Sequence, residues 1–322
     1  MKKWLTGFCI LLFLSIAAVY IFFPSDLTVA NVEGIQCNVN SANKFIGDER
    51  QWGNWWPGDS GRGQPAGALA DGRSPGFEYG GMRYRMPGRY RHLMEVQIVT
   101  PDSTIHSRIT IVGSADTRDS TSLEWAFHLN AGWDPIGRIH QYREARKLKA
   151  DLAEILSALR AFLDDKEKVY GIRIREVSTT DSFLIAIRSI YPSRPGTGDL
   201  SALIHKLKSI IAAGSVRETG NPMVNITPAG QGKFEAMVAI PTNRELKGDK
   251  NVISSKLVRG KYLMTEVRGG DYTVNKALEQ LQEYMYDYQR TTMAIPFQSW
   301  VTDRSVEHDT AKWVTKVYCP VY

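Results

Sequence analysis

The stretch that decides the fold of the second half runs from Tyr262 to Tyr284 and reads YLMTEVRGGDYTVNKALEQLQEY. An apolar extended segment, Tyr262–Arg268, leads into a Gly-Gly turn. A helix is then expected to begin at Asp271, because aspartate is a common helix N-cap. The same order occurs earlier in the chain, where Phe183–Arg188 reads as extended and a helix is expected from Asp199. The two aspartates are 72 positions apart, which indicates an internal repeat.

Two further extended segments complete each repeat. They lie at 222–227 and 234–241 in the first copy and at 296–302 and 313–320 in the second. Each copy therefore reads strand–helix–strand–strand. Paired copies of such a unit are expected to lie about a pseudo-twofold axis with a groove between them. We predict this doubled arrangement for residues 169–322.

Residues 25–168 predict a separate α+β domain. Extended segments rich in β-branched and aromatic residues lie at 92–99, 104–112 and 121–129, after an opening strand near 27–32. A long helix is expected from about Gln141 to Lys166, because its apolar residues recur at three- and four-residue spacing and form one wide stripe: Leu148, Leu152, Ile155, Leu156, Leu159, Phe162 and Leu163. Such a stripe is wide enough to lie across a curved sheet, in a helix-grip arrangement.

Two short motifs near the start of this domain carry a resemblance. The first is QCNVNSANKF at 36–45, where Ser41 is the expected N-cap of a short helix, and the second is WGNWWP at 52–57. Together they resemble the START-like, polyketide-cyclase superfamily over residues 25–168. The resemblance implies a hydrophobic cavity between the sheet and the long helix, and it does not imply one reaction. The tryptophans of the second motif are expected either to staple the short helix to the sheet or to line the mouth of a ligand site.

A run of 20 residues without charge, Trp4–Phe23, predicts an N-terminal transmembrane anchor within residues 1–24. At 1.5 Å per residue such a helix is about 30 Å long, which is the thickness of the hydrocarbon core of a bilayer. The run is longer than the apolar region of a signal peptide, so an uncleaved anchor is favoured. Lys2 and Lys3 precede it, whereas 24–43 holds no Lys or Arg. The positive-inside rule therefore predicts a single-pass bacterial inner-membrane protein with a cytoplasmic N-terminus and both domains in the periplasm.

The second half resembles the gyrase-inhibitory-protein-like effector-binding domain, which is also appended to AraC- and MerR-type activators. The motifs that carry this resemblance are VRGGDY at 267–272, PFQSWVTD at 296–303 and TKVYCPV at 315–321. The resemblance implies a groove that binds organic, often cationic, small molecules, commonly with a glutamate in the Pro-aromatic strand. In this chain that position holds Gln298. An amide neither neutralises a cation nor acts as a general base at neutral pH, so cation preference and the hydrolase activity of some relatives are both in doubt.

Six residues are the candidate ligand-binding set. Gln298 and Trp300 are two apart and share one face of an extended strand, which is expected to line the groove. Glu266 is a candidate replacement for the missing carboxylate, with an exposed strand glutamate as the alternative. The remaining members are aromatic residues that are suited to stacking on a flat ligand or a cation, or otherwise to core packing: Tyr272, Trp313 and Tyr318.

Composition excludes several other functions. The chain of 322 residues has three cysteines and six histidines, and it contains no CxxC, HExxH or P-loop motif, so we expect neither a metal nor a cofactor. The net charge of +6 is spread out and no helix-turn-helix is recognisable, so we expect no nucleic-acid partner.

We therefore expect a membrane-anchored binding protein that captures a small hydrophobic or amphipathic molecule for sensing, sequestration or transfer. One alternative is a hydrolase or cyclase, although no spacing ties together its candidates Glu124, His128, His140 and Glu266. The other alternative is a module that docks a membrane partner.

Overall fold

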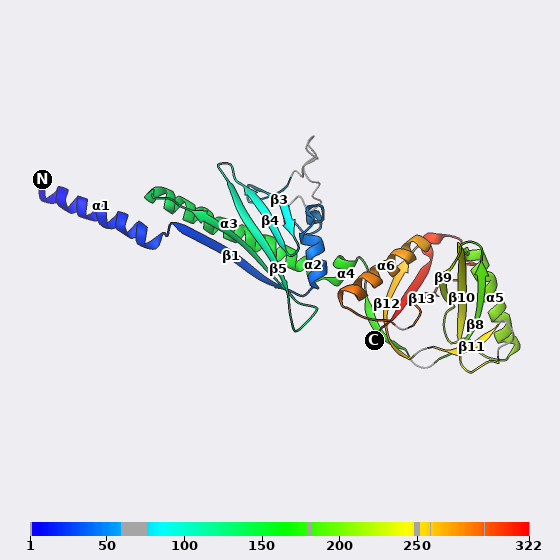
Figure 1. Ribbon diagram of the computed structural model, residues 1–322. Helices are drawn as coiled ribbons and strands as arrows, with labels where there is room; N and C mark the ends of the chain where they lie inside the picture. Colours follow the sequence, from blue (N-terminus) through cyan, green and yellow to red (C-terminus); the bar gives the residue numbers. More distant parts are fainter. Residues whose placement is uncertain are drawn as a thin grey trace, which may run out of the picture. The chain divides into compact units, whose positions relative to one another are not determined.

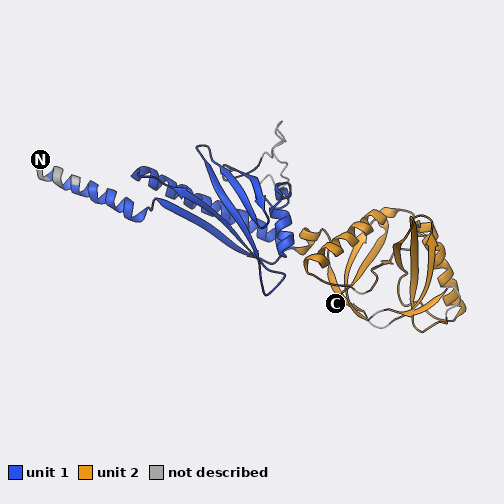
Figure 2. Cartoon of the chain, in the orientation of Figure 1, with its two compact units in different colours: residues 1–165 blue, residues 166–322 orange. Residues whose placement is uncertain are grey.

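The computed structural model describes residues 2–58, 76–179, 182–247, 252–257, 259–292 and 294–321. The chain forms two compact units, residues 1–165 and 166–322 (Figure 2). The sequence predicts a boundary after Lys168, and the two units divide after Asp165. Both units combine helices with an antiparallel sheet, so the α+β class is confirmed.

The first unit contains a six-stranded antiparallel sheet with the strand order β1-β6-β5-β4-β3-β2 (Figure 1). Hydrogen bonding between β1 and β6 joins the start of the unit to its last strand, with Val29 opposite Phe127. Its elements are β1 (Asp26–Ile35), α2 (Val39–Ile46), the 3-10 helix η1 (Glu49–Asn54), β2 (Phe77–Tyr79), β3 (Met82–Tyr90), β4 (Leu93–Val99), β5 (Thr104–Gly113), β6 (Thr121–Asn130) and α3 (Pro135–Leu163).

The long helix α3 packs along β1 through the predicted apolar stripe. All stripe residues are buried except Phe162, which is half-buried and touches Phe45 edge-on at 4.9 Å between ring centroids. The helix begins six residues before the predicted start. Asp134 caps its first turn by accepting from the backbone of Ile136 and Gly137, and Pro135 occupies the first helical position. The predicted order of an opening strand, a short helix, antiparallel strands and a long helix is therefore present.

The short helix α2 is fixed to the sheet by the tryptophan motif. The indole N–H groups donate to backbone carbonyls, Trp52 to Ile46 at 2.8 Å and Trp56 to Glu78 at 3.0 Å. Trp52, Trp55 and Trp56 are all buried, which favours the stapling interpretation over a ligand mouth. The predicted N-cap is wrong: Asn38 caps α2, and Ser41 lies buried within the helix. An asparagine side chain caps as well as a serine, and it stands one residue before the first helical turn.

The N-terminal helix α1 (Lys2–Phe22) ends against the start of α3. The Tyr20 hydroxyl donates to the carbonyl of Trp133, and the guanidinium of Arg138 lies 4.5 Å from the centroid of the Tyr20 ring. Within the part of the chain that the structure describes, no helix is both long enough and apolar enough to cross a membrane.

The second unit contains one eight-stranded antiparallel sheet with the order β11-β8-β10-β9-β13-β14-β12-β7. The predicted doubled unit is present, because β8-α5-β9-β10 is repeated as β12-α6-β13-β14 and the repeats meet at β9 and β13. The bounds are α4 (Lys166–Tyr170), β7 (Arg175–Thr179), β8 (Phe183–Tyr191), α5 (Thr197–Ala213), β9 (Met223–Gly230), β10 (Lys233–Thr242), β11 (Ile253–Lys256), β12 (Gly260–Arg268), α6 (Asp271–Asp287), β13 (Phe297–Trp300), the 3-10 helix η2 (Thr310–Lys312) and β14 (Val314–Val321).

Each repeat also has a leading strand that the sequence did not reveal, and the two repeats exchange these strands. The first, β7, pairs with β12 of the second repeat, whereas β11 of the second repeat pairs with β8 of the first. Both are short and lie at the edges of the sheet. The two repeats are consequently held together at three places in one sheet.

The predicted helix caps of this unit are wrong by a few residues. Gly196 is the N-cap of α5, and Asp199 stands three residues into the helix, where its carboxylate accepts from the Gly196 backbone N–H at 2.9 Å. Gly270 is the N-cap of α6, and Asp271 is the first helical residue. Both aspartates still lie in the first turn, where a carboxylate is favourable to the helix dipole.

Candidate functional site

The two faces of the eight-stranded sheet differ in what covers them. Alternate residues of β8 and β10, such as Ile187 and Val238, are buried in one core cluster with Leu200 and Leu207 of α5. The other helix, α6, packs against β12 and β14, and Figure 1 shows the two helices on opposite outer sides of the unit. The residues that alternate with these buried ones, such as Arg188 of β8 and Met237 of β10, point to the opposite face of the sheet. We call this face, which neither helix covers, the helix-free face.

A cavity of about 340 Å³ lies on the helix-free face. Both repeats contribute to it, because Met223 and Met237 come from the first and Tyr262 and Phe297 from the second. Further lining residues are mostly apolar, and the polar ones are few: Leu184, Arg188, Val224, Asn225, Ala239, Ser255, Lys256, Leu257, Ala294 and Ile295. An apolar cavity with a small number of polar groups is the usual form of a small-molecule site.

Three aromatic rings in mutual contact form an aromatic wall, and two of them, Tyr262 and Phe297, line the cavity. The ring of Phe297 is stacked on that of Tyr318 with 4.9 Å between centroids, and Tyr262 meets both rings edge-on. Offset-stacked and edge-on ring pairs are favourable arrangements, so the wall is formed before any ligand arrives. Burial raises the pKa of the Tyr318 hydroxyl, and the nearby carboxylate of Glu266 raises it further.

Gln298 and Trp300 share a strand face as predicted, and the Trp300 indole N–H lies 3.4 Å from the Gln298 side-chain oxygen. That face packs toward α5. Gln298 stands opposite Val224, which is fully buried, and Trp300 is itself buried in the same core cluster. The cavity is lined instead by Phe297, one residue earlier in the strand. Side chains alternate along a strand, so a shift of one residue exchanges the faces.

Trp300 and Trp313 already hold a cation that belongs to the chain. The guanidinium of Arg304 lies 3.8 Å from the Trp300 ring centroid and 4.5 Å from that of Trp313. It also donates to Thr315 at 2.8 Å and forms an ion pair with Asp271 at 3.3 Å. Burial lowers the pKa of Arg304 to about 10, against the opposing effect of Asp271. The space between these two indoles is therefore filled by Arg304.

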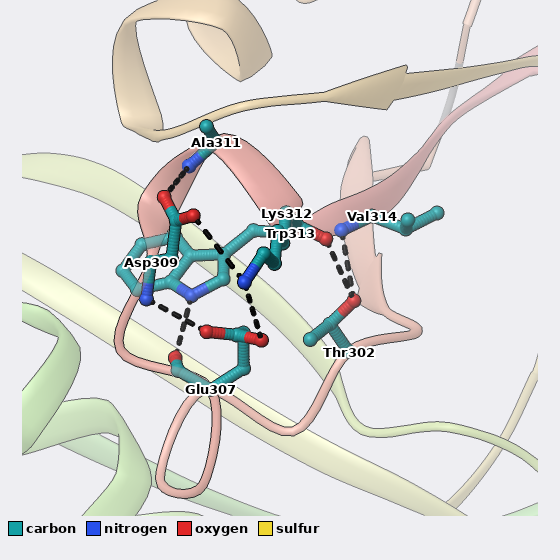
Figure 3. A network of polar contacts seen from close by, with 7 residues as sticks. All are labelled: Thr302, Glu307, Asp309, Ala311, Lys312, Trp313 and Val314. Carbon is teal, nitrogen blue, oxygen red and sulfur yellow. Dashed lines mark hydrogen bonds and ion pairs between the residues drawn. The ribbon is translucent and has the colours of Figure 1, made fainter.

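Trp313 also anchors the loop that carries Arg304. Its indole N–H donates to the carbonyl of Glu307 at 2.8 Å, inside the polar network drawn in Figure 3. In the same network the carboxylate of Glu307 accepts from the backbone of Asp309 at 2.9 Å, and the Thr302 hydroxyl accepts from the backbone of Val314 at 2.9 Å. These contacts give Trp313 a structural role.

The two remaining candidates lie apart from the cavity lining. Tyr272 is in the first turn of α6, and 80% of it is exposed to solvent. Glu266 is exposed on the helix-free face beside a separate polar depression, 3.8 Å from Lys316. The six predicted residues are thus distributed over four places, and only Tyr318 belongs to the aromatic wall.

The enzyme candidates His128, His140 and Glu266 contact other residues and not one another. The pairing of β1 with β6 places the Thr28 hydroxyl 3.1 Å from Nδ1 of His128, while Nε2 of His128 lies 3.6 Å from Asp26. The second distance is longer than a hydrogen bond, and His128 and Asp26 are more than half exposed. His140 lies on α3, 3.8 Å from Glu144. Among the described residues, no group of His, Cys, Asp or Glu is placed to hold a metal ion.

Sequence reasoning missed most of the cavity. Met223, Met237 and Leu184 stood in predicted strands, but nothing in their own pattern distinguishes the face under the helices from the free face. The sequence predicts that Gln298 and Trp300 face the groove, whereas the neighbouring residue Phe297 lines the cavity.

Comparison with known proteins gives low similarity. No family model matches the chain, and no curated protein matches it either. Among solved structures, the EcmrR C-terminal domain is 15% identical over 47% of this chain and 98% of its own, with a TM-score of 0.41. The structure of SAV2435 bound to tetraphenylphosphonium is 16% identical over 47% of this chain and 94% of its own, with a TM-score of 0.33.

A third structure, a hydrolase from Listeria innocua, is 9% identical over 47% of this chain and 92% of its own, with a TM-score of 0.37. At these scores the similarity assigns no activity to the chain. None of the three is named as a START-like protein, so the family of the first unit stays a prediction.

Proposed function

We propose that the second unit binds a small hydrophobic or amphipathic molecule in the cavity on its helix-free face. The observation that carries this proposal is the lining itself, in which two methionines and two aromatic rings from different repeats surround about 340 Å³. Met223 and Tyr262 are already buried, whereas Met237 and Phe297 are only half-buried at the cavity. A ligand in the cavity would cover the exposed apolar surface of Met237 and Phe297, which is favourable.

The lining suits ligands with a flat apolar body. The wall formed by Tyr262, Phe297 and Tyr318 offers ring faces and edges whose positions are fixed by their mutual contacts. Met223 and Met237 also line the cavity, and methionine side chains are flexible and polarisable, so they adjust to ligand shape. Capture of this kind serves sensing, sequestration or transfer equally, and catalysis is not required for any of them.

The first prediction tests the aromatic wall. Phe297→Ala removes the ring that both lines the cavity and supports Tyr318. The affinity for the neutral dye N-phenyl-1-naphthylamine should fall about tenfold or more, because a lost aromatic contact and its buried area are together worth roughly 1–3 kcal/mol. Fluorescence titration of the full chain measures this. Tyr272→Ala, an exposed aromatic of the same unit, is the matched control and should bind as the parent does. Equal affinity in the parent and in Phe297→Ala would remove the cavity from consideration.

The enzymatic alternative rests on the Thr28, His128 and Asp26 cluster. Its exposure to water and its long second distance do not support an activated nucleophile. Binding is therefore the function that the geometry supports better.

We also propose, separately, that α1 attaches the chain to a membrane, with the single-pass inner-membrane location and periplasmic units expected from Lys2 and Lys3. Support comes from exposed apolar side chains along α1, among them Phe8, Phe13 and Phe22. Trp133 and Ile136, which lie beside the end of α1, are 85% and 77% exposed. Tryptophan is favoured at membrane–water interfaces.

The test of this attachment is fractionation. The protein should remain with membranes after carbonate washing, and protease added to spheroplasts should digest both units. A soluble mature form that lacks the first ~20 residues would identify a signal peptide instead. Protection from external protease would reverse the orientation.

A further inference from the structure

We propose that the ligand of the cavity is an anion, an apolar or aromatic body with one acidic group, and that Arg188 recognises the acid. This inference rests on the proposed function and specifies the class of molecule. It departs from the cationic ligands that the family resemblance implies, and it follows from the charges that border the cavity.

Arg188 provides an available guanidinium at the cavity. It lies on β8 opposite Met237, so both side chains are on the helix-free face, and both line the cavity. It forms an ion pair with Glu235, with 3.8 Å between Nη1 and the carboxylate oxygen, which is longer than a hydrogen bond. The side chain is half exposed. Because this ion pair is long and half exposed, the planar donors of Arg188 can still take a carboxylate or sulfonate in a two-pronged contact.

A second cation borders the same cavity. Lys256 of β11 is part of the lining, and its ammonium lies 5.2 Å from the centroid of the Phe183 ring. The described residues that line the cavity include no aspartate or glutamate. With Glu235 beside Arg188, the two cations leave an excess of positive charge at the cavity, so an anion would be attracted and an organic cation would not.

The polar depression on the same face also offers no unpaired negative charge to a cationic ligand. In the neighbouring polar depression Glu167 is paired with Arg173 at 2.9 Å, and Glu266 with Lys316 at 3.8 Å. Arg175 lines that depression as well and stands opposite Met264. The carboxylates of the depression are therefore already opposed by cations, and they leave no excess negative charge for an organic cation.

The experiment compares three probes on the full chain by fluorescence titration and competition. They are 8-anilinonaphthalene-1-sulfonate, N-phenyl-1-naphthylamine, which has the same rings without the sulfonate, and tetraphenylphosphonium, a cation of similar apolar character. The anion should bind the parent most tightly. Arg188→Gln should weaken the anion about tenfold, the usual cost of one charge-assisted contact, and leave the neutral amine within about twofold. Arg217→Gln changes the net charge of the same unit equally at an exposed position outside the cavity lining and should change neither.

The outcomes distinguish the anionic ligand from the more general proposal that the cavity binds a small molecule. If the neutral amine binds and responds to Phe297→Ala, but tetraphenylphosphonium binds more tightly than the sulfonate, the cavity stands and the anionic ligand is refuted. Equal loss of the sulfonate in Arg188→Gln and Arg217→Gln would show a general charge effect and also refute the role of Arg188. If no probe responds to Phe297→Ala, both proposals fail together.

Discussion

Arg304 shows at the scale of one residue how a predicted binding feature became a packing feature. A guanidinium between two indoles is a favourable arrangement, worth about 0.5–2 kcal/mol for each contact when it is desolvated. Trp300 and Trp313 are therefore suited to a cation, as the sequence indicated, but the cation is covalently part of the chain. This occupancy could not be read from spacing, because Arg304 meets Thr315 and Asp271 only after the strands have paired.

A stability prediction belongs to this residue. Arg304→Leu should lower the free energy of unfolding of the second unit by about 2 kcal/mol, because it removes both ring contacts and leaves the buried Thr315 hydroxyl without its donor. Asp271 is more than half exposed and is solvated by water in the variant, so its loss of a partner adds little. Urea unfolding measures the change, with Arg217→Gln as an exposed control. A midpoint unchanged from the parent would mean that desolvation of the guanidinium cancels its contacts.

The edge strand β7 is held to its partner by an ion-pair cluster. Glu176 contacts Lys261 of β12 and Arg290, which follows α6, at 2.7 Å each. The hydrogen bond from Lys261 is the main cause that lowers the pKa of Glu176, and Arg290 adds to it. Since the folded-state pKa is below the usual value of 4.5, the stabilisation is present above about pH 4.5 and is lost as the pH falls through the folded-state pKa.

The corresponding prediction compares variants across that pH window. Glu176→Gln should destabilise the second unit by about 0.5–1 kcal/mol at pH 7, the size expected for a partly exposed pair, and by less at about pH 2, because the stabilisation is lost as the pH falls through the lowered folded-state pKa of Glu176. Denaturant unfolding at both pH values checks this. Glu279→Gln, on the exposed side of α6, is the control and should show neither effect. A constant difference at both pH values would mean that the side chain acts through packing.

At the scale of elements, the sequence predicted well what depends on local periodicity. The apolar stripe from Leu148 to Leu163 and the spacing from Asp199 to Asp271 identified the long helix and the doubled unit. Helix starts were less accurate, because asparagine caps as readily as serine, and because glycine also occupies the N-cap position, with the aspartate then inside the first turn. The sequence did not predict which face of β13 borders the cavity. Phe297 and Gln298 point to opposite faces, and the local pattern of the strand fits either choice. The position of α5, a non-local fact, decides which of them faces the cavity.

At the scale of the whole molecule, each unit has a buried core of its own. We therefore predict two calorimetric transitions for the full chain. A ligand of the cavity should raise the temperature of one transition only, by several degrees at about 100 times its Kd. Phe297→Ala should abolish that rise. A rise in both transitions, or a single transition at all ligand concentrations, would contradict independent units.

The exchange of β7 and β11 between the repeats bears on the ancestry and the folding of the second unit. Two separate copies of one repeat that traded their leading strands would form a domain-swapped homodimer, and joining the copies in tandem gives the observed strand order. In such a chain neither repeat can complete its own sheet edge until the other has been synthesised. The cavity is lined by residues of both repeats, so it cannot form in a chain that ends after the first repeat.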